Sequence, residues 1–181
     1  MSDERLFVAC DVPLIARQWI HDAIDREAFD DARWITLENQ HITLRFLGAT
    51  SSERAPLVMD ACAAAADAHG SARVRVDGLG VFPSLRRAAV LWAGVRDESR
   101  VLTKLAAGLD DVLGELGWDR EKRSFTPHVT LARFRRPQRM GALPKLPSGA
   151  PDFDIDSLTL YRSRLHPKGS RYEVIGRFPL S

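Results

Sequence analysis

The order of apolar and polar positions along the chain predicts a mixture of strands and helices. Short apolar or alternating runs bounded by turn residues are typical of strands, and such runs cover residues 6–10, 41–47, 73–79, 88–95, 125–134, 154–161 and 172–178. Apolar residues at helical spacing predict helices from Leu14 onward and over 99–116, and an alanine-rich body at 61–68 predicts a third. Because these elements do not alternate strictly, the pattern favours an α+β fold with mostly antiparallel sheet.

Turn-forming residues indicate where several of these elements end. Gly48 is expected to stop the second strand, and Ser51 and Ser52 are expected to cap the helix that follows. Four prolines and two glycines within 137–151 predict a loop there. No linker divides the 181 residues, so we expect a single domain over 1–181 in which any two lobes share an interface.

A near-duplicate motif is the most informative feature of the sequence. The sequence HITL at 41–44 returns as HVTL at 128–131, and each copy is followed within a few residues by Arg and Phe. Side chains alternate between the two faces of a strand, so the His and Thr of each copy share one face and the apolar pair shares the other. Two such copies, one in each half, predict two pseudo-symmetric lobes whose polar faces bring the motifs together.

The paired motifs suit phosphoryl transfer by general acid–base catalysis. Imidazole titrates near neutrality, so one of His41 and His128 can take a proton while the other gives one. The hydroxyls of Thr43 and Thr130 can donate to the non-bridging phosphate oxygens, where negative charge grows in the transition state. A nearby Arg would complete the anion site, because its planar fork matches phosphate.

Other kinds of site lack their usual patterns. A zinc site needs three or four ligands, often at His-x3-His spacing or with Cys partners, and neither pattern occurs, so we expect no metal and no cofactor. The sequence also has no Gly-x-Ser-x-Gly and no phosphate-binding glycine loop. His21 and His69 are expected to be structural, while His166, in a basic turn, is a weaker candidate for a substrate contact. Cys10 and Cys62 are expected to be buried free thiols.

Charge and hydropathy narrow the class of protein further. The net charge is +2, but residues 1–90 hold 10 Lys/Arg and 13 Asp/Glu while residues 91–181 hold 16 and 11, giving −3 and +5. A basic second half suits a phosphate-bearing ligand. No signal-peptide pattern occurs, and no apolar run approaches the ~20 residues of a membrane span. We therefore expect a cytoplasmic protein with no membrane association.

The motifs and their flanks resemble the 2H phosphoesterases, which are named for two His-x-Thr-x motifs. More narrowly, the chain resembles the bacterial RNA 2′,3′-cyclic phosphodiesterases, long called 2′-5′ RNA ligases, over nearly its whole length. The resemblance rests on HITLRFLG at 41–48, VLWAGV at 90–95 and FTPHVTLAR at 125–133. It implies a bilobal α+β fold with outer helices around a central cleft, and metal-independent hydrolysis of a terminal 2′,3′-cyclic phosphate to a 2′-phosphate.

The resemblance also implies roles for individual residues. His41 would protonate the leaving 3′ oxygen, His128 would remove a proton from water, and the two threonines would hold the phosphate. The nearly symmetric motifs do not themselves assign acid and base. Arg133 is the best candidate for a further phosphate or nucleotide contact. It lies an odd number of residues after Thr130, so it reaches the same face only if its side chain bends or the strand bulges.

The expected partner is RNA with a 2′,3′-cyclic phosphate terminus or a small cyclic nucleotide, bound by a monomer. Phe46 and Phe134, which follow the two motifs, are candidates for stacking on a base. Two other functions stay open. The same acid–base pair would serve 2′-5′ RNA ligation, with an RNA hydroxyl in place of water, and a non-catalytic nucleotide or RNA-binding module would keep the same cleft.

Overall fold

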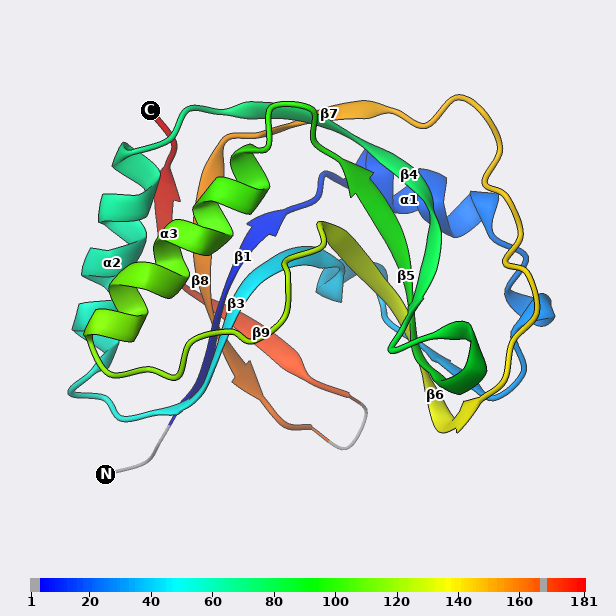
Figure 1. Ribbon diagram of the computed structural model, residues 1–181, viewed down its shortest axis with the longest axis horizontal. Coiled ribbons are helices and arrows are strands. Elements are labelled where there is room, and N and C mark those ends of the chain that lie inside the picture. Colours follow the sequence, from blue (N-terminus) through cyan, green and yellow to red (C-terminus); the bar gives the residue numbers. More distant parts are fainter. Residues whose placement is uncertain (1–3, 167–168) are drawn as a thin grey trace.

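A computed structural model describes residues 4–166 and 169–181, which form two antiparallel β-sheets and three α-helices (Figure 1). The four-stranded sheet has the order β3-β1-β8-β9, from β1 (Glu4–Asp11), β3 (His41–Thr50), β8 (Ser157–Arg164) and β9 (Arg171–Pro179). The five-stranded sheet has the order β2-β6-β5-β4-β7, from β2 (Ala32–Trp34), β4 (Ala72–Phe82), β5 (Ala88–Arg96), β6 (His128–Gln138) and β7 (Asp152–Ile155). The α+β class and the two-lobed arrangement are confirmed.

The chain crosses between the two sheets several times. β1 and β3 lie in the four-stranded sheet, yet β2, which comes between them in sequence, lies in the other. After β4 to β7 the chain returns, and β8 pairs with β1 in the four-stranded sheet. Because each lobe is built from both halves of the chain, neither lobe is a separate sequence segment.

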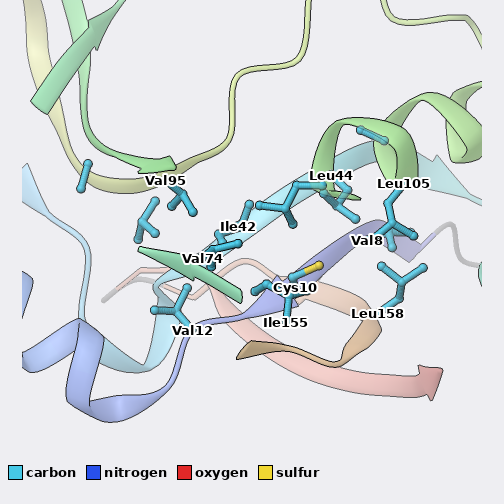
Figure 2. Close-up of a cluster of buried hydrophobic side chains, with 14 of the residues drawn as sticks. Val8, Cys10, Val12, Ile42, Leu44, Val74, Val95, Leu105, Ile155 and Leu158 are labelled. Carbon is cyan, nitrogen blue, oxygen red and sulfur yellow. The ribbon is translucent and has the colours of Figure 1, made fainter. Parts of the chain in front are cut away.

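Two helices pack on the four-stranded sheet, and a third packs on the five-stranded sheet. α2 (Ala55–Asp67) packs on β8 and β9, and α3 (Val101–Glu115) packs on β3, as Figure 1 shows. α1 (Leu14–Ala23) lies against the five-stranded sheet, where Ile20 and Leu131 line the same small cavity. Buried side chains of both sheets form one continuous hydrophobic cluster, in which Ile42 and Cys10 meet Val74 and Ile155 (Figure 2). The apolar positions of the two motifs anchor their strands in this cluster.

Several sequence predictions about element ends are wrong. The predicted strand at 154–161 is two strands, β7 and β8, which belong to different sheets, because alternation alone does not show where a chain leaves one sheet for another. Gly48 does not stop β3; it adopts a φ of 68° within the strand, beside an irregularity in the pairing with β1. Neither serine caps α2, whose N-cap is Arg54 with no side-chain hydrogen bond.

Both cysteines are buried and free, as the sequence predicts. Burial holds the pKa of the Cys10 thiol far above its ordinary value and raises that of Cys62 to about 12. Residues 139–151 form no helix or strand, as predicted, whereas Pro137 and Gln138, which the predicted loop also included, are the last residues of β6. Within the two described ranges, no helix is both long and apolar enough to cross a lipid bilayer.

Candidate functional site

The two copies of the motif each begin a strand. His41 is the first residue of β3 and His128 is the first residue of β6. The two strands belong to different sheets but contact each other, and Figure 1 shows them starting side by side near the centre of the molecule. The imidazoles are close enough for the charge of His128 to lower the pKa of His41. The fold therefore joins histidines that lie 87 residues apart in sequence.

Both strands bulge at the same position of the motif. The pairing of β3 with β1 skips Leu44, and the pairing of β6 with β5 skips Leu131. A bulge adds one residue to a strand and so shifts the alternation of its side chains by one. We call the side of β3 and β6 that carries the histidines and threonines the histidine face. Beyond each bulge, the fifth residue after the histidine returns to this face.

Arg133 reaches the histidine face for this reason. Val90 and Trp92, which are two residues apart on β5, pair with Arg133 and Thr130. Residues two apart on a regular strand share a face, and so do their cross-strand partners. The guanidinium is exposed to solvent, and its charge lowers the pKa of His128. The odd spacing noted in the sequence is thus compensated by the bulge, with no need for the side chain to bend.

His41 is half-buried among aromatic rings. Its ring centroid lies 4.9 Å from that of Phe7, 5.3 Å from that of Tyr172 and 6.0 Å from that of Tyr161. Burial lowers the pKa of His41 from 6.5 to about 4, and a hydrogen bond with the Asn39 backbone acts in the opposite direction. In the free protein this ring is neutral at pH 7.

The carboxylate of Asp11 lies beside His41. Asp11 is its cross-strand partner in β1, and the negative charge opposes the lowering of the histidine pKa. The hydroxyl of Tyr161 donates to Asp11 Oδ1, and Arg177 Nη1 lies 2.7 Å from Asp11 Oδ2. Burial and this hydrogen bond raise the pKa of Tyr161, which keeps the phenol protonated. The network holds Asp11 and Tyr161 in place beside the imidazole.

His128 is oriented by its own backbone. Its Nδ1 lies 2.7 Å from the carbonyl oxygen of Thr126. A carbonyl only accepts, so Nδ1 carries the proton and Nε2 of the neutral ring has a free lone pair. Burial lowers the pKa of His128, the hydrogen bond to Thr126 opposes this, and the charge of Arg133 lowers it further. His41 makes its corresponding backbone hydrogen bond with Asn39, also two residues before the histidine.

Aromatic rings also flank His128. The ring centroid of Phe82 lies 5.0 Å from that of His128, edge to face, and that of Trp92 lies 5.8 Å away. The Trp92 ring lies over Gly80, where any Cβ would overlap its atoms. The absence of a side chain at Gly80 therefore leaves the space that the Trp92 indole occupies beside His128.

Thr43 and Thr130 are half-buried on the histidine face, two residues after the histidines. The structure thus brings together all five residues that the sequence singles out: His41, Thr43, His128, Thr130 and Arg133. The arrangement offers two imidazoles, two hydroxyls and one guanidinium. These groups can transfer protons and donate hydrogen bonds to an anion.

The residues that follow the two motifs differ in their surroundings. Arg45 is buried and its Nη1 pairs with Asp110 of α3 at 3.1 Å, so it joins β3 to the helix rather than entering the site. Phe134 is buried, with 7% of its surface exposed, so it cannot stack on a base. Phe46 is 63% exposed and lies on the histidine face, 6.0 Å from Phe7 between ring centroids. Only Phe46 keeps the stacking role that the sequence suggests.

Phe46 also borders a groove of about 600 Å³. The groove lies between the middle of β3 and the loop 117–123, and Lys122 and Arg123 line it. This loop leads from α3 toward His128, and neither histidine lines the groove.

His21 and His69 lie away from this site. His21 contacts Asp22 and Arg26 on the surface of α1, and His69 Nδ1 lies 2.9 Å from the carbonyl oxygen of Ala65 at the end of α2. His166 is exposed in the turn after β8, and residues 167 and 168 of that turn lie outside the described part of the chain. In the described part, no three His, Cys, Asp or Glu residues gather in a way that could hold a metal ion.

Sequence reasoning missed the residues that surround the histidines. These are Asp11, Phe7, Tyr161 and Tyr172 around His41, and Phe82 and Trp92 around His128. They come from strands far from the motifs in sequence, so no local pattern connects them. Strand order and register, which the sequence does not give, place them.

Comparison with known proteins agrees with this geometry. The sequence profile of the 2′-5′ RNA ligase superfamily matches residues 12–167. A Thermus thermophilus protein named RNA 2′,3′-cyclic phosphodiesterase is 31% identical over 184 residues, which cover 97% of this chain and 90% of that protein. A Geobacillus stearothermophilus protein of the same name is 32% identical over 150 residues, 81% of this chain, and the chain spans 47% of its length.

A solved structure has the same fold over the whole chain. E. coli LigT complexed with 3′-AMP superposes with a TM-score of 0.82 at 26% identity, covering 99% of both chains. The two histidine motifs, their facing strands and the match over residues 12–167 together identify the family. The protein belongs to the 2′-5′ RNA ligase superfamily.

Proposed function

We propose that this protein hydrolyses 2′,3′-cyclic phosphate ends of RNA to 2′-phosphates, with His41 and His128 as a metal-independent acid–base pair. The observation that carries the proposal is that the two histidines begin two contacting strands, β3 and β6, each histidine being tied through a hydrogen bond to the backbone two residues before it. Relatives named RNA 2′,3′-cyclic phosphodiesterase support the class of enzyme, a cyclic phosphodiesterase.

In the first half of the reaction, Nε2 of neutral His128 takes a proton from water. Because Nδ1 donates to the Thr126 carbonyl, Nε2 is the nitrogen with a free lone pair. The water oxygen forms a bond to phosphorus as its proton moves to His128. A positioned general base of this kind contributes roughly 10²–10⁴ in rate.

In the second half, the bond between phosphorus and the 3′ oxygen breaks. Protonated His41 gives its proton to that oxygen, which leaves as a hydroxyl, and the phosphate stays on the 2′ oxygen. One proton enters at His128 and one leaves at His41, so the two histidines exchange protonation states in each turnover. Proton exchange with solvent restores the starting state.

His41 must first be protonated to act as an acid. Its pKa of about 4 in the free protein results mainly from burial, which penalises the charged ring. A bound cyclic phosphate carries a negative charge that favours the imidazolium, so substrate binding raises this pKa toward neutrality. The buried ring thereby becomes protonated in response to its anionic substrate.

The remaining polar groups act on the phosphate. The hydroxyls of Thr43 and Thr130 donate to non-bridging oxygens from opposite lobes, while the Arg133 guanidinium, further along the same face, attracts an anionic substrate through its charge. Such donors stabilise the charge that develops in the transition state without reorganising. E. coli LigT, solved with 3′-AMP, is an example of a nucleotide bound in this fold.

A short RNA that ends in a 2′,3′-cyclic phosphate tests the proposal. The purified protein is incubated with this RNA, with and without EDTA, and the product is resolved as a 2′- or a 3′-phosphate. We expect a 2′-phosphate at the same rate in both conditions. Turnover lost in EDTA would overturn the metal-independent mechanism. Binding without turnover would favour a non-catalytic module, and joined RNA as the main product would favour ligation.

A further inference from the structure

Two arginines lie directly opposite each other beside the candidate site. In the antiparallel pairing of β2 with β6, Arg33 is the partner of Arg133. Cross-strand partners have their side chains on the same face of a sheet. Arg33 therefore lies on the histidine face, one strand further from β5 than Arg133.

Nothing in the described part of the chain offsets these two charges. Both guanidiniums are exposed, and neither forms an ion pair with a carboxylate of residues 4–166 or 169–181. Several arginines on other strands do have such partners, among them Arg73 with Asp154 at 3.2 Å, Arg96 with Asp77 at 2.8 Å and Arg162 with Glu4 at 2.7 Å. Like charges directly opposite on paired strands destabilise a sheet. An anion bound between the two side chains would remove this repulsion.

The distance of this pair from the motif suits a second phosphate. Val90, which faces Arg133, is two residues along β5 from Trp92, which faces Thr130. Two residues of a strand span about 6.6 Å, and Arg33 lies one strand further, about 4.8 Å to the side. The arginine pair is therefore about one nucleotide away from the threonine that would hold the cyclic phosphate. Arg133 is near enough to lower the pKa of His128.

We propose that Arg33 and Arg133 form a second anion subsite, which binds the phosphate on the 5′ oxygen of the terminal nucleoside. This inference rests on the proposed function, because the cyclic phosphate fixes the other end of the nucleoside. The subsite makes the protein favour the end of a polynucleotide, or a 5′-phosphorylated cyclic nucleotide, over a nucleoside with a cyclic phosphate alone. Arginine suits this position because its planar fork donates two parallel hydrogen bonds to phosphate.

Three substrates test the subsite: a nucleoside 2′,3′-cyclic phosphate, the same compound with a 5′-phosphate, and a dinucleotide that ends in the cyclic phosphate. KM and kcat are measured for the native protein, Arg33→Gln, Arg33→Lys and Lys104→Gln. Lys104 is exposed on α3, away from the five-stranded sheet, and its replacement removes one charge as a control.

We expect Arg33→Gln to raise KM about tenfold more for the two substrates with a 5′-side phosphate than for the nucleoside 2′,3′-cyclic phosphate, with little change in kcat. Arg33→Lys should recover part of the loss, and Lys104→Gln should not discriminate among substrates. The salt dependence of log KM for the dinucleotide should weaken by ~0.7 in Arg33→Gln, the loss of one phosphate contact to a single strand. Equal effects on all three substrates, or no effect, would overturn the subsite.

Binding of product-like nucleotides separates this inference from the proposed function. Titration calorimetry with a nucleoside 2′-phosphate and a nucleoside 2′,5′-bisphosphate needs no turnover. The subsite predicts that the native protein binds the bisphosphate about tenfold more tightly and that Arg33→Gln removes this preference. That result without hydrolysis of any cyclic substrate would contradict the proposed function alone. Equal binding of both nucleotides by the native protein would contradict the subsite alone.

Discussion

Leu44 and Leu131 are the bulge residues of two strands from different sheets, each three positions after a histidine of the candidate site. The repeat is therefore present in the backbone as well as in the sequence. The two bulges bring Phe46 and Arg133 to equivalent places on the histidine face. The four-stranded sheet thus has an aromatic ring where the five-stranded sheet has a cation. A nucleotide can contact both, because its base stacks on aromatic rings and its phosphate binds cations.

Phe46 and Phe134 should respond differently to replacement by alanine. Phe46→Ala removes an exposed ring that can stack on a base, so we expect KM for RNA to rise about tenfold with the thermal midpoint unchanged. Phe134→Ala removes a buried ring and should lower the free energy of unfolding by about 3–5 kcal/mol. Steady-state kinetics and thermal unfolding of both variants check this. Equal KM for native protein and Phe46→Ala would contradict the stacking role.

His41→Ala and His128→Ala should each lower kcat by about 10²–10⁴, because each removes one proton transfer. His21→Ala, which changes an exposed histidine on α1, is the matched control and should keep native turnover. Circular dichroism should show folded protein for all three. If either of the first two variants lost activity only by unfolding, the catalytic role of that histidine would not stand.

The pH dependence of kcat/KM should be displaced to the acid side. This parameter reports the free enzyme, in which burial lowers the pKa of both histidines below 6.5, to about 4 for His41. A bell-shaped profile has its maximum between the two pKa values, so the maximum of kcat/KM should lie below pH 6.5. The maximum of kcat, which reports the complex, should lie at higher pH, because the bound anion raises both pKa values. A kcat/KM maximum above pH 7 would contradict this.

Because of His41, the free energy of unfolding should also decrease as the pH is lowered. The unfolded chain binds a proton at this ring near pH 6.5, while the folded ring resists protonation until about pH 4. The unfolded state therefore binds more protons in that window, and stability decreases as pH falls through it, by up to about 3 kcal/mol. Urea unfolding of the native protein and of His41→Gln between pH 7 and 4 measures this. The variant should show a smaller decrease, and parallel curves would refute the assignment.

Arg33→Gln should stabilise the protein in low-salt buffer without phosphate. Removing one of two facing like charges should raise the free energy of unfolding by about 0.2–1 kcal/mol. Added inorganic phosphate should stabilise the native protein more than the variant, since only the native pair holds the anion between two guanidiniums. Thermal unfolding with and without phosphate makes the comparison, and a less stable variant in phosphate-free buffer would count against repulsion between the two arginines.

The sequence predicts the chemistry of the site better than its surroundings. The repeated motif alone singles out His41, Thr43, His128 and Thr130 as candidates, because strand alternation puts each His and Thr on one face. It leaves Arg133 undecided, since a bulge at Leu131 changes the parity and the sequence has no local signal for that bulge. The pairing of β6 with β5 in the structure shows which face Arg133 lies on.

Long-range pairing accounts for the rest of what the sequence does not predict. Arg33 belongs to no motif of the sequence, and its place opposite Arg133 is visible only once β2 pairs with β6. Asp11 lies between the strand predicted over 6–10 and the helix predicted from Leu14, yet it is the cross-strand partner of His41. The division between β7 and β8 at Asp156 has the same origin, because the choice of sheet depends on neighbours far along the chain.

A substrate with sulfur in place of the 3′ oxygen tests the paired-histidine mechanism most directly. Sulfur leaves as a thiolate, whose conjugate thiol has a pKa of about 8.5, so this substrate needs no proton from the general acid. We predict that His41→Ala hydrolyses the 3′-thio cyclic phosphate at close to the native rate, whereas His128→Ala remains slow. Equal impairment of both variants, or recovery of His128→Ala alone, would contradict the assignment of His41 as acid and His128 as base.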